Sequence, residues 1–305
     1  MLPHREQYLL APDGRPVEVP DGRGGTQKLR ATHYAATNGD FTLSIRAGMK
    51  RGPSVAHPRV SRGIPYGGLA RLLLCYIVTE AQKKGSRTID LGQTITSFCE
   101  RVDVTPSGGR FGRIPYLVDQ LERLATAVVD FHWERSEGAG RARRSRDQGE
   151  SILIVDAFDF WRRGATPASE AARGGTITLS QKFWDEVVAE CFPLDFRKAQ
   201  FLRAYPTAYD LYLWLTYKLA QLERAHRPLV AVNYDQLHAQ LGSHYQTDAR
   251  GVLTPKGKKN FGAKIRKALD AIRAVWPRLD VRTPRGRLVL YATGPDVAQV
   301  PSRYR

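Results

Sequence analysis

Two stretches of the sequence, residues 66–160 and 208–292, repeat the same order of expected elements. Each reads as a long apolar helix, a short strand, a short helix, an amphipathic helix, and two strands joined by a basic hairpin. Both amphipathic helices open on the dipeptide Phe-Gly, at Phe111-Gly112 and at Phe261-Gly262. A pattern that recurs within one chain indicates two copies of one structural unit that can act on a partner together.

Length agrees with a duplicated organisation. The chain has 305 residues, and domains average roughly 150 residues, so about two domains are expected. An apolar content of 42% is enough to fill two cores. From the composition we expect a flexible N-terminal arm over residues 1–40, a first domain over 41–161, a linker over 162–175, a second domain over 176–295 and a C-terminal tail over 296–305.

Local patterns predict the individual elements. Apolar residues at helical spacing predict long helices, and alternation of apolar and polar residues predicts strands. The expected helices cover residues 67–84, 94–101, 111–126, 207–224, 234–242 and 259–275. The expected strands cover residues 41–47, 88–91, 126–134, 151–160, 176–180 and 229–233, followed by a hairpin over 279–292.

The charge of the chain restricts its partners. It holds 47 Lys and Arg against 30 Asp and Glu, which gives a net charge of +17. Clustered positive charge is typical of proteins that bind a polyanion, whereas charge that serves only solubility need not be clustered. Two helix-rich units with basic tips therefore favour duplex DNA as the partner.

The sequence also indicates a compartment. It has no apolar run of about 18 residues that would predict a transmembrane helix, and its start lacks the apolar core of a signal peptide. Cys75, Cys99 and Cys191 lie far apart and read as small core residues in a reducing environment. We therefore expect a cytoplasmic protein without a metal or another cofactor.

The second amphipathic helix concentrates the positive charge. One face is apolar, and the opposite face is basic with a single acid, Asp270, on the whole helix. A helix that enters a DNA groove needs such an apolar back and basic front; the alternative is a solvated surface helix, which usually mixes Glu with Lys. The expected apolar face consists of Phe261, Ile265, Leu269 and Ile272. The candidate DNA-binding residues here are Lys256, Lys258, Lys259, Asn260, Lys264, Arg266 and Lys267, with Asn260 and Arg266 as base readers.

The first amphipathic helix carries less charge. We expect Ile114, Leu117, Val118, Leu121 and Leu124 to be buried. We expect Tyr116, Asp119, Gln120 and Arg123 to point outward, where Asp119 and Arg123 could simply pair. The candidate DNA-binding residues are Arg110, Arg113, Tyr116 and Gln120, with Arg113 as a further base reader. For Tyr116 and Gln120 a role as surface residues alone is the alternative.

Both expected hairpins carry arginines near their tips. Flexible arginine wings suit the phosphate backbone or a narrow minor groove, although a polar loop without contacts is the alternative for the first wing. The candidates are Arg141, Arg143, Arg144 and Arg146 in the first hairpin, and Arg282, Arg285 and Arg287 in the second.

The search for catalytic motifs favours a binding protein over an enzyme. The stretch 251–259 resembles a phosphate-binding loop but has five residues between its glycines where four are needed, and Lys259 stands in place of Ser or Thr. There is no Cys/His cluster at zinc spacing, and His132 has no second His for the metal site of a nickase. A nuclease with paired carboxylates is a further alternative, although Asp156 and Asp159 read as exposed or edge positions of a strand.

Short motifs in a fixed order run through both halves of the chain. In the first half they are Ile64-Pro65-Tyr66-Gly67, Ala70-Arg71-Leu72-Leu73-Leu74, Thr79-Glu80-Ala81, Ser86-Arg87, Leu91-Gly92, Gly108-Gly109-Arg110-Phe111-Gly112, Asp119-Gln120 and Arg123-Leu124. In the second half they are Leu179-Ser180, Phe183-Trp184, Pro193-Leu194-Asp195 and Tyr209-Asp210-Leu211-Tyr212-Leu213-Trp214-Leu215. From residue 41 to residue 292, this ordered set resembles the plasmid-encoded RepA replication initiators.

The resemblance implies an α+β fold, predominantly helical, with two tandem winged-helix domains. Residues 93–124 and 234–273 would be their helix-turn-helix segments. It also implies a DNA-binding initiator that recognises direct repeats (iterons) in a plasmid origin, helps to open the adjacent AT-rich DNA and recruits the host replication initiator and helicase machinery. Several relatives bind repeats as monomers and repress their own promoter as homodimers. A winged-helix transcriptional regulator without replication activity is the main alternative.

Overall fold

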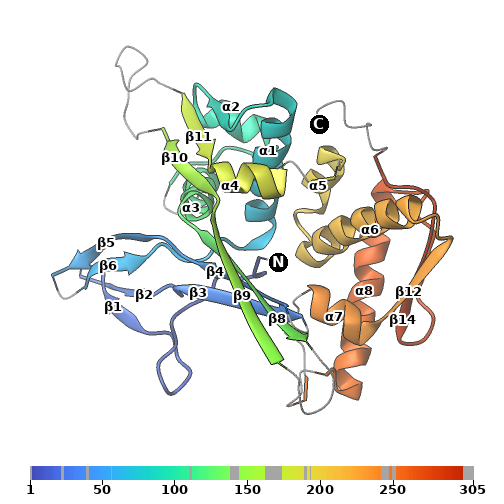
Figure 1. Ribbon diagram of the computed structural model, residues 1–305. Helices are drawn as coiled ribbons and strands as arrows, with labels where there is room; N and C mark the ends of the chain where they lie inside the picture. The colour runs from blue at the N-terminus through green and yellow to red at the C-terminus, as the bar shows by residue number, and fades with distance from the viewer. Residues whose placement is uncertain are drawn as a thin grey trace. The chain divides into compact units, whose positions relative to one another are not determined.

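The computed structural model (Figure 1) describes residues 2–21, 24–38, 41–55, 57–109, 112–137, 144–161, 174–188, 191–192, 194–241, 247–248 and 252–297. The fold is mixed, with 40% helix and 29% strand, so it has more strand than a predominantly helical fold. The chain divides into two compact units, Leu2–Glu190 and Cys191–Arg305. No helix in the described part is long and apolar enough to cross a membrane.

Three helices of the first unit begin and end close to the residues that the sequence indicated. They are α1 (Gly67–Lys84), α2 (Ile95–Arg101) and α3 (Arg113–Ala125). The unit also contains α4 (Gln181–Phe183) and a π-helical turn over Trp184–Val188, which fall within the expected second domain. α1 ends at Gly85, whose φ of 59° lies in the left-handed region and whose amide bonds the carbonyls of Ala81 and Gln82. The Thr94 side chain caps α2 by accepting from the Ser97 amide.

The strands of the first unit pair entirely in antiparallel fashion. Two hairpins stand apart, β1 (Glu18–Pro20) with β2 (Thr26–Lys28) and β5 (Met49–Ser54) with β6 (His57–Ser61). A four-stranded sheet has the order β3-β4-β8-β9, from His33–Asn38, Phe41–Arg46, Val128–Glu137 and Arg144–Leu153. A three-stranded sheet has the order β10-β11-β7, from Val155–Asp159, Gly175–Leu179 and Thr88–Gly92.

The N-terminal 40 residues differ from the expected unpatterned arm. They contain β1, β2 and β3, and β3 pairs with β4 along its whole length. Arg71, which is 4% exposed, donates from its guanidinium to the carbonyls of Leu2 and Pro3. Very short strands are stabilised by partners and not by their own pattern, so local composition gives no sign of them.

The boundary between the units also differs from the expected linker at 162–175. β11 lies between β10 and β7, and it pairs with both. Residues 175–179 therefore complete a sheet of the first unit and do not begin the second. This assignment depends on pairing across more than 80 residues of sequence, such as Thr178 with Thr88, which no local pattern reveals.

The first hairpin is longer than the polar loop over 135–150 suggested. β8 and β9 stay in register from the pair Val128–Leu153 to the pair Glu137–Arg144. Pairing satisfies the backbone even where the side chains are polar, so polarity alone does not exclude a strand. In Figure 1 the two strands form the long green ribbon of the first unit.

From its longest helix onward the second unit follows the order that the sequence predicted, whereas its first helix was not expected. It contains α5 (Phe196–Leu202), α6 (Pro206–Arg224), β12 (Leu229–Asn233), α7 (Tyr234–Leu241), α8 (Pro255–Val275), β13 (Val281–Arg282) and β14 (Arg287–Tyr291). The strands form one sheet of order β12-β14-β13. α6 packs against α8, α7 and β14 (Figure 1), so the longest apolar helix supplies the centre of this core.

The three cysteines are unpaired. Cys75, Cys99 and Cys191 form no disulfide, and Cys99 is fully buried.

The sequence left open whether Leu74 and Ile77 on α1 face the core or a dimer interface. Ile77 is fully buried within the unit, whereas Leu74 is half-buried.

A buried arginine holds several segments of the first unit together. Arg123, which is 1% exposed, donates to Glu6 at 2.5 Å and to the carbonyl of Ile64 at 3.0 Å, and pairs with Asp119 at 2.8 Å. Arg30, whose side chain is 27% exposed, also pairs with Glu6 at 3.0 Å and with Asp119 at 2.8 Å. Arg123 is therefore the more deeply buried of the two partners of these carboxylates, and its removal weakens their compensation.

We therefore predict that Arg123→Met lowers the free energy of unfolding of the first unit by about 2 to 4 kcal/mol, because Glu6 and Asp119 lose a buried partner. Urea denaturation, with amide hydrogen exchange in α3 as the local readout, measures this. Arg46→Met is the matched control, since the Arg46 side chain is 57% exposed and pairs with Asp130, and it should cost about 0 to 1 kcal/mol. Equal costs for the two variants would contradict the structural role of Arg123.

Candidate nucleic-acid interface

α8 begins four residues before the expected start at Lys259. Thr254 caps it by accepting from the Gly257 amide at 3.1 Å, and Pro255 occupies the first turn. Proline is favoured there because its missing amide hydrogen has no partner in the helix anyway. The earlier start places Lys256 and Lys258 on the helix itself, together with the other basic residues.

The apolar face of α8 is confirmed. Phe261, Ile265, Leu269 and Ile272 are all completely buried. The ring of Phe261 meets the rings of Tyr234 and His238 edge to face, at centroid distances of 5.8 and 5.4 Å. This packing against α7 fixes the rotation of α8 about its axis, and so fixes the direction of its other face.

Close packing explains why a glycine, Gly262, follows Phe261 in the second Phe-Gly dipeptide. A Cβ atom at this position would lie 2.7 Å from Cε2 of Tyr234, closer than any carbon contact in a packed core. The glycine thus lets the Tyr234 ring approach the backbone of α8. Burial raises the pKa of the Tyr234 hydroxyl, so the ring stays neutral next to the basic helix.

The opposite face of α8 is basic and open. The side chains of Lys256, Lys258, Lys259, Asn260, Arg266 and Lys267 are exposed, and Lys264 is half-buried. Lys258 pairs with Asp235 of α7 at 2.7 Å, and Asp270 lies near Arg273, with 3.7 Å between the charged atoms. The exposed charges of Lys256, Lys259, Arg266 and Lys267 can meet an anionic partner.

The hairpin of the second unit presents three more arginines. Arg282, Arg285 and Arg287 are exposed, and the turn closes with a bond from the Arg287 amide to the Pro284 carbonyl at 3.0 Å. Arg282 is partly engaged, because its guanidinium lies over the Tyr291 ring at 4.7 Å. The Tyr234 amide donates to the Gly286 carbonyl at 3.0 Å, which ties the turn to the start of α7.

In the first unit two expected outward positions are wrong. Gln120 is completely buried, and its Oε1 accepts from the Tyr66 amide at 3.0 Å. Arg123 is also buried, as described above. Tyr116 is half-buried with its ring 5.9 Å from that of Tyr66. The chain before α1 covers this side of α3, and helical periodicity cannot show that a distant segment covers a second face.

The remaining candidates of the first unit are placed only in part. Arg113 is exposed at the start of α3, and its backbone amide donates to Oγ of Ser107 at 2.9 Å. Arg144 and Arg146 lie on β9, where the backbone alone is described. Arg110, Arg141 and Arg143 lie outside the described residues.

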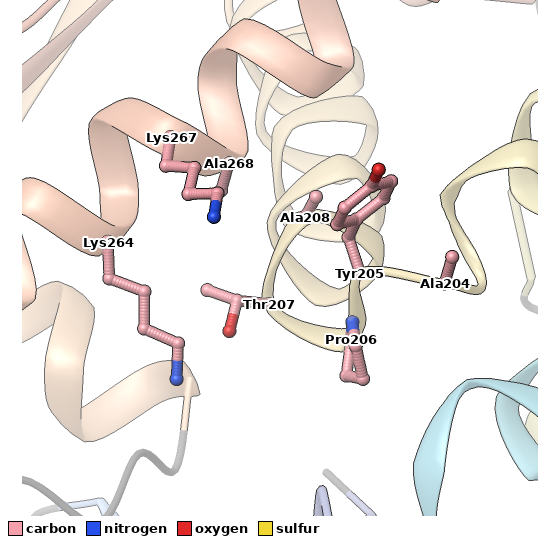
Figure 2. A pocket seen from close by; sticks show the side chains of 8 residues that line it. All are labelled: Ala204, Tyr205, Pro206, Thr207, Ala208, Lys264, Lys267 and Ala268. Carbon is pink, nitrogen blue, oxygen red and sulfur yellow. The ribbon is translucent and has the colours of Figure 1, made fainter.

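Sequence reasoning missed a hollow at the start of α6. It is lined by Ala204, Tyr205, Pro206, Thr207, Ala208, Lys264, Lys267 and Ala268, and has a volume of about 300 Å³ (Figure 2). Lys264 and Lys267 were expected to bind DNA, but Thr207 was not. The signal in the sequence was Tyr205-Pro206-Thr207, a helix start with proline and no capping side chain.

The carboxylates considered for nuclease chemistry lie on an edge strand. Asp156 and Asp159 are exposed on β10, which is the edge of its sheet, and Asp156 pairs with Arg87 at 3.3 Å. Within the described ranges no three His, Cys, Asp or Glu residues are grouped so as to hold a metal ion.

Comparison with known proteins places the chain beside replication proteins. The family model described as plasmid-encoded RepA protein matches residues 64–236. A crystal structure of domains 2 and 3 of RctB, a selenomethionine derivative, superposes with a TM-score of 0.50 at 10% identity and covers 88% of this chain and 93% of that chain. A second structure of RctB domains 2–3 gives a TM-score of 0.45 at 11% identity, with coverages of 86% and 91%. Among curated proteins no match was found.

We predict that Gly262→Ala destabilises the second unit, although the same change elsewhere in a helix gains about 1 kcal/mol. The added methyl group would clash with the Tyr234 ring, and overpacking of this kind costs about 1 to 3 kcal/mol. In a Tyr234→Ala background the same substitution should instead stabilise, because the clash is gone. Urea denaturation of the four proteins gives the cycle, and a stabilising effect of Gly262→Ala in the wild-type background would contradict the packing described.

Proposed function

Because the chain belongs to the family of plasmid-encoded RepA proteins, we propose that it initiates plasmid replication by binding direct repeats (iterons) in the plasmid origin. It acts on duplex DNA in the cytoplasm and is not an enzyme. The observation that carries this proposal is α8, with its apolar face buried and its basic face open.

The order of elements in the second unit supports a winged-helix domain. A helix, a strand, two helices and a two-stranded hairpin follow one another as α6-β12-α7-α8-β13-β14, and the first strand pairs with the last. In this arrangement α7 and α8 form the helix-turn-helix, with α8 as the recognition helix and the β13–β14 hairpin as the wing. Asn260 and Arg266 would then read base edges, while the lysines and wing arginines would contact phosphates.

The first unit repeats the order α1-β7-α2-α3-β8-β9. We assign it as a second winged-helix domain with a lower affinity for DNA. Its long hairpin is reinforced by β4, which pairs with β8 from Phe41 to Arg46. Arg113 is its exposed candidate on α3. Gln120 and Tyr116 are not assigned to DNA, because the first is buried and the second faces Tyr66.

The later steps of initiation follow from the family. In this proposal the protein opens the AT-rich DNA next to its repeats and recruits the host replication initiator and helicase machinery. Repression of its own promoter as a homodimer completes the proposal. Each of these steps begins with sequence-specific binding, so binding is the step to test first.

Footprinting of the purified protein on the DNA that flanks its gene, with non-specific competitor, tests the proposal. We expect protection of an array of direct repeats, because two basic units suit repeated sites along one duplex. A single protected inverted repeat at a promoter, with no effect on plasmid maintenance, would indicate a transcriptional repressor instead. Salt-sensitive coating of any DNA without a protected site would show that the basic faces only hold phosphates.

Substitutions on α8 should separate phosphate contacts from base reading. Lys259→Ala should weaken binding to specific and non-specific duplex alike and lower the slope of log affinity against log salt by about 1. Asn260→Ala should cost about 1 to 3 kcal/mol on the specific site and leave the slope unchanged. Fluorescence anisotropy over a salt series measures both effects.

Lys218→Ala is the control for this series, since Lys218 lies on α6 and its ammonium donates to Gln221 at 2.9 Å. It should leave the affinity and the slope as they are. If Lys218→Ala weakened binding as much as Lys259→Ala, general charge and not the face of α8 would account for the affinity.

A further inference from the structure

Tyr234 lies where three parts of the second unit meet. It is the first residue of α7, directly after β12, and only 4% of it is exposed. Its amide donates to the carbonyl of Gly286 in the hairpin turn at 3.0 Å, and its ring meets that of Phe261 edge to face. One residue therefore links the start of α7 to the hairpin and to α8, the helix against which α7 packs (Figure 1).

Arg266 leans back along α8 toward the same point. Side chains of an α-helix tilt toward its N-terminus, so a long side chain covers the position four residues before it. A Cβ atom on Gly262 would lie 2.7 Å from Cε2 of Tyr234 and 3.5 Å from Nη1 of Arg266. The missing side chain of Gly262 thus leaves a notch in α8, with the ring edge of Tyr234 and the guanidinium of Arg266 both against it.

The hydroxyl of Tyr234 is buried beside this guanidinium. Among the described residues none gives it a hydrogen bond of ideal geometry. Burial raises the pKa of the hydroxyl, and the nearby positive charge of Arg266 lowers it in part. A buried hydroxyl without a regular partner costs free energy that a neighbouring donor recovers. A guanidinium carries only donors, so the hydroxyl favours an Arg266 side chain that stays in the notch.

The arrangement matters because Arg266 is exposed. A long exposed side chain samples many rotamers and loses that freedom when it binds a partner. A guanidinium held on one side by the notch keeps its other N–H groups pointing in one direction. Such a fixed fork suits the paired acceptors O6 and N7 of guanine in the major groove.

We propose that Tyr234 is a positioning residue for Arg266, and that its ring and hydroxyl hold the guanidinium in the notch so that Arg266 reads one guanine at a fixed place beside the hairpin. The inference rests on the proposed function, in which Arg266 reads base edges. Tyr234 is buried, so it acts through Arg266 and contributes to specificity without touching DNA.

The first test is made on the full chain without DNA. NMR relaxation of the Nε–H group of Arg266 measures its motion, and loss of the signal in Arg266→Lys assigns it. We expect restricted motion in the wild type and freer motion in Tyr234→Phe, which keeps the ring and removes the hydroxyl. Equal motion in the two proteins would overturn the positioning role, whatever the protein binds.

The second test measures base preference by fluorescence anisotropy, on the duplex repeat found by footprinting and on versions with one base pair changed. For the wild type we expect one G·C pair whose replacement weakens binding about 10-fold, and Arg266→Ala should be indifferent to that replacement. Tyr234→Phe should bind the repeat about 5-fold more weakly, the size of one lost hydrogen bond, and lose most of its preference at that pair. Its affinity for non-specific duplex and its salt slope should not change, because no charge is removed.

Two comparisons separate positioning from packing. In an Arg266→Ala background Tyr234→Phe should have no further effect on affinity or base preference, because it acts through Arg266. Tyr212→Phe is the matched control, since it also removes a buried hydroxyl of the second unit, one that donates to Asp296 at 2.7 Å. Tyr212→Phe should lower the thermal unfolding midpoint and keep the base preference. Tyr234→Phe should keep or raise the midpoint and lose the preference.

The pattern of affinities distinguishes failure of this inference from failure of the proposed function. If Tyr234→Phe keeps the full preference at the G·C pair, or weakens binding equally with and without Arg266, the positioning role is overturned while the proposed function stands. If the wild type prefers no duplex sequence, the proposed function and the reading role of Arg266 fail together.

Discussion

The burial of one face of α8 is the constraint on which the second unit depends. Phe261, Ile265, Leu269 and Ile272 are completely buried, and at roughly 1.5 to 3 kcal/mol for each large apolar side chain they hold the helix in one rotation about its axis. With that rotation fixed, the basic side chains of the opposite face point away from the core. The glycine beside Phe261 serves the same end, because it lets Tyr234 pack against the helix backbone. Packing thus determines where the charge points, and charge determines what the unit can bind.

The first unit has the same order of elements, but its third helix has a buried arginine where the third helix of the second unit has an exposed basic face. Helix α3 is buried on two sides. Its Arg123 interacts with Glu6, with Asp119 and with the carbonyl of Ile64. A buried ion pair adds little net stability against an apolar equivalent, but it ties three distant segments in one geometry. The N-terminal residues are thereby part of the scaffold. The two units therefore differ in how much positive charge their third helix leaves for a partner.

Local sequence patterns predicted what depends on neighbours within a helical turn or a hairpin. Strand β12 and the buried face of α8 follow from residues close in sequence, and both were found as expected. The patterns failed where a segment packs against a distant one. Gln120 is buried because the chain before α1 covers α3, and β11 joins the first unit because it pairs with β7. Neither partner can be located from composition or periodicity.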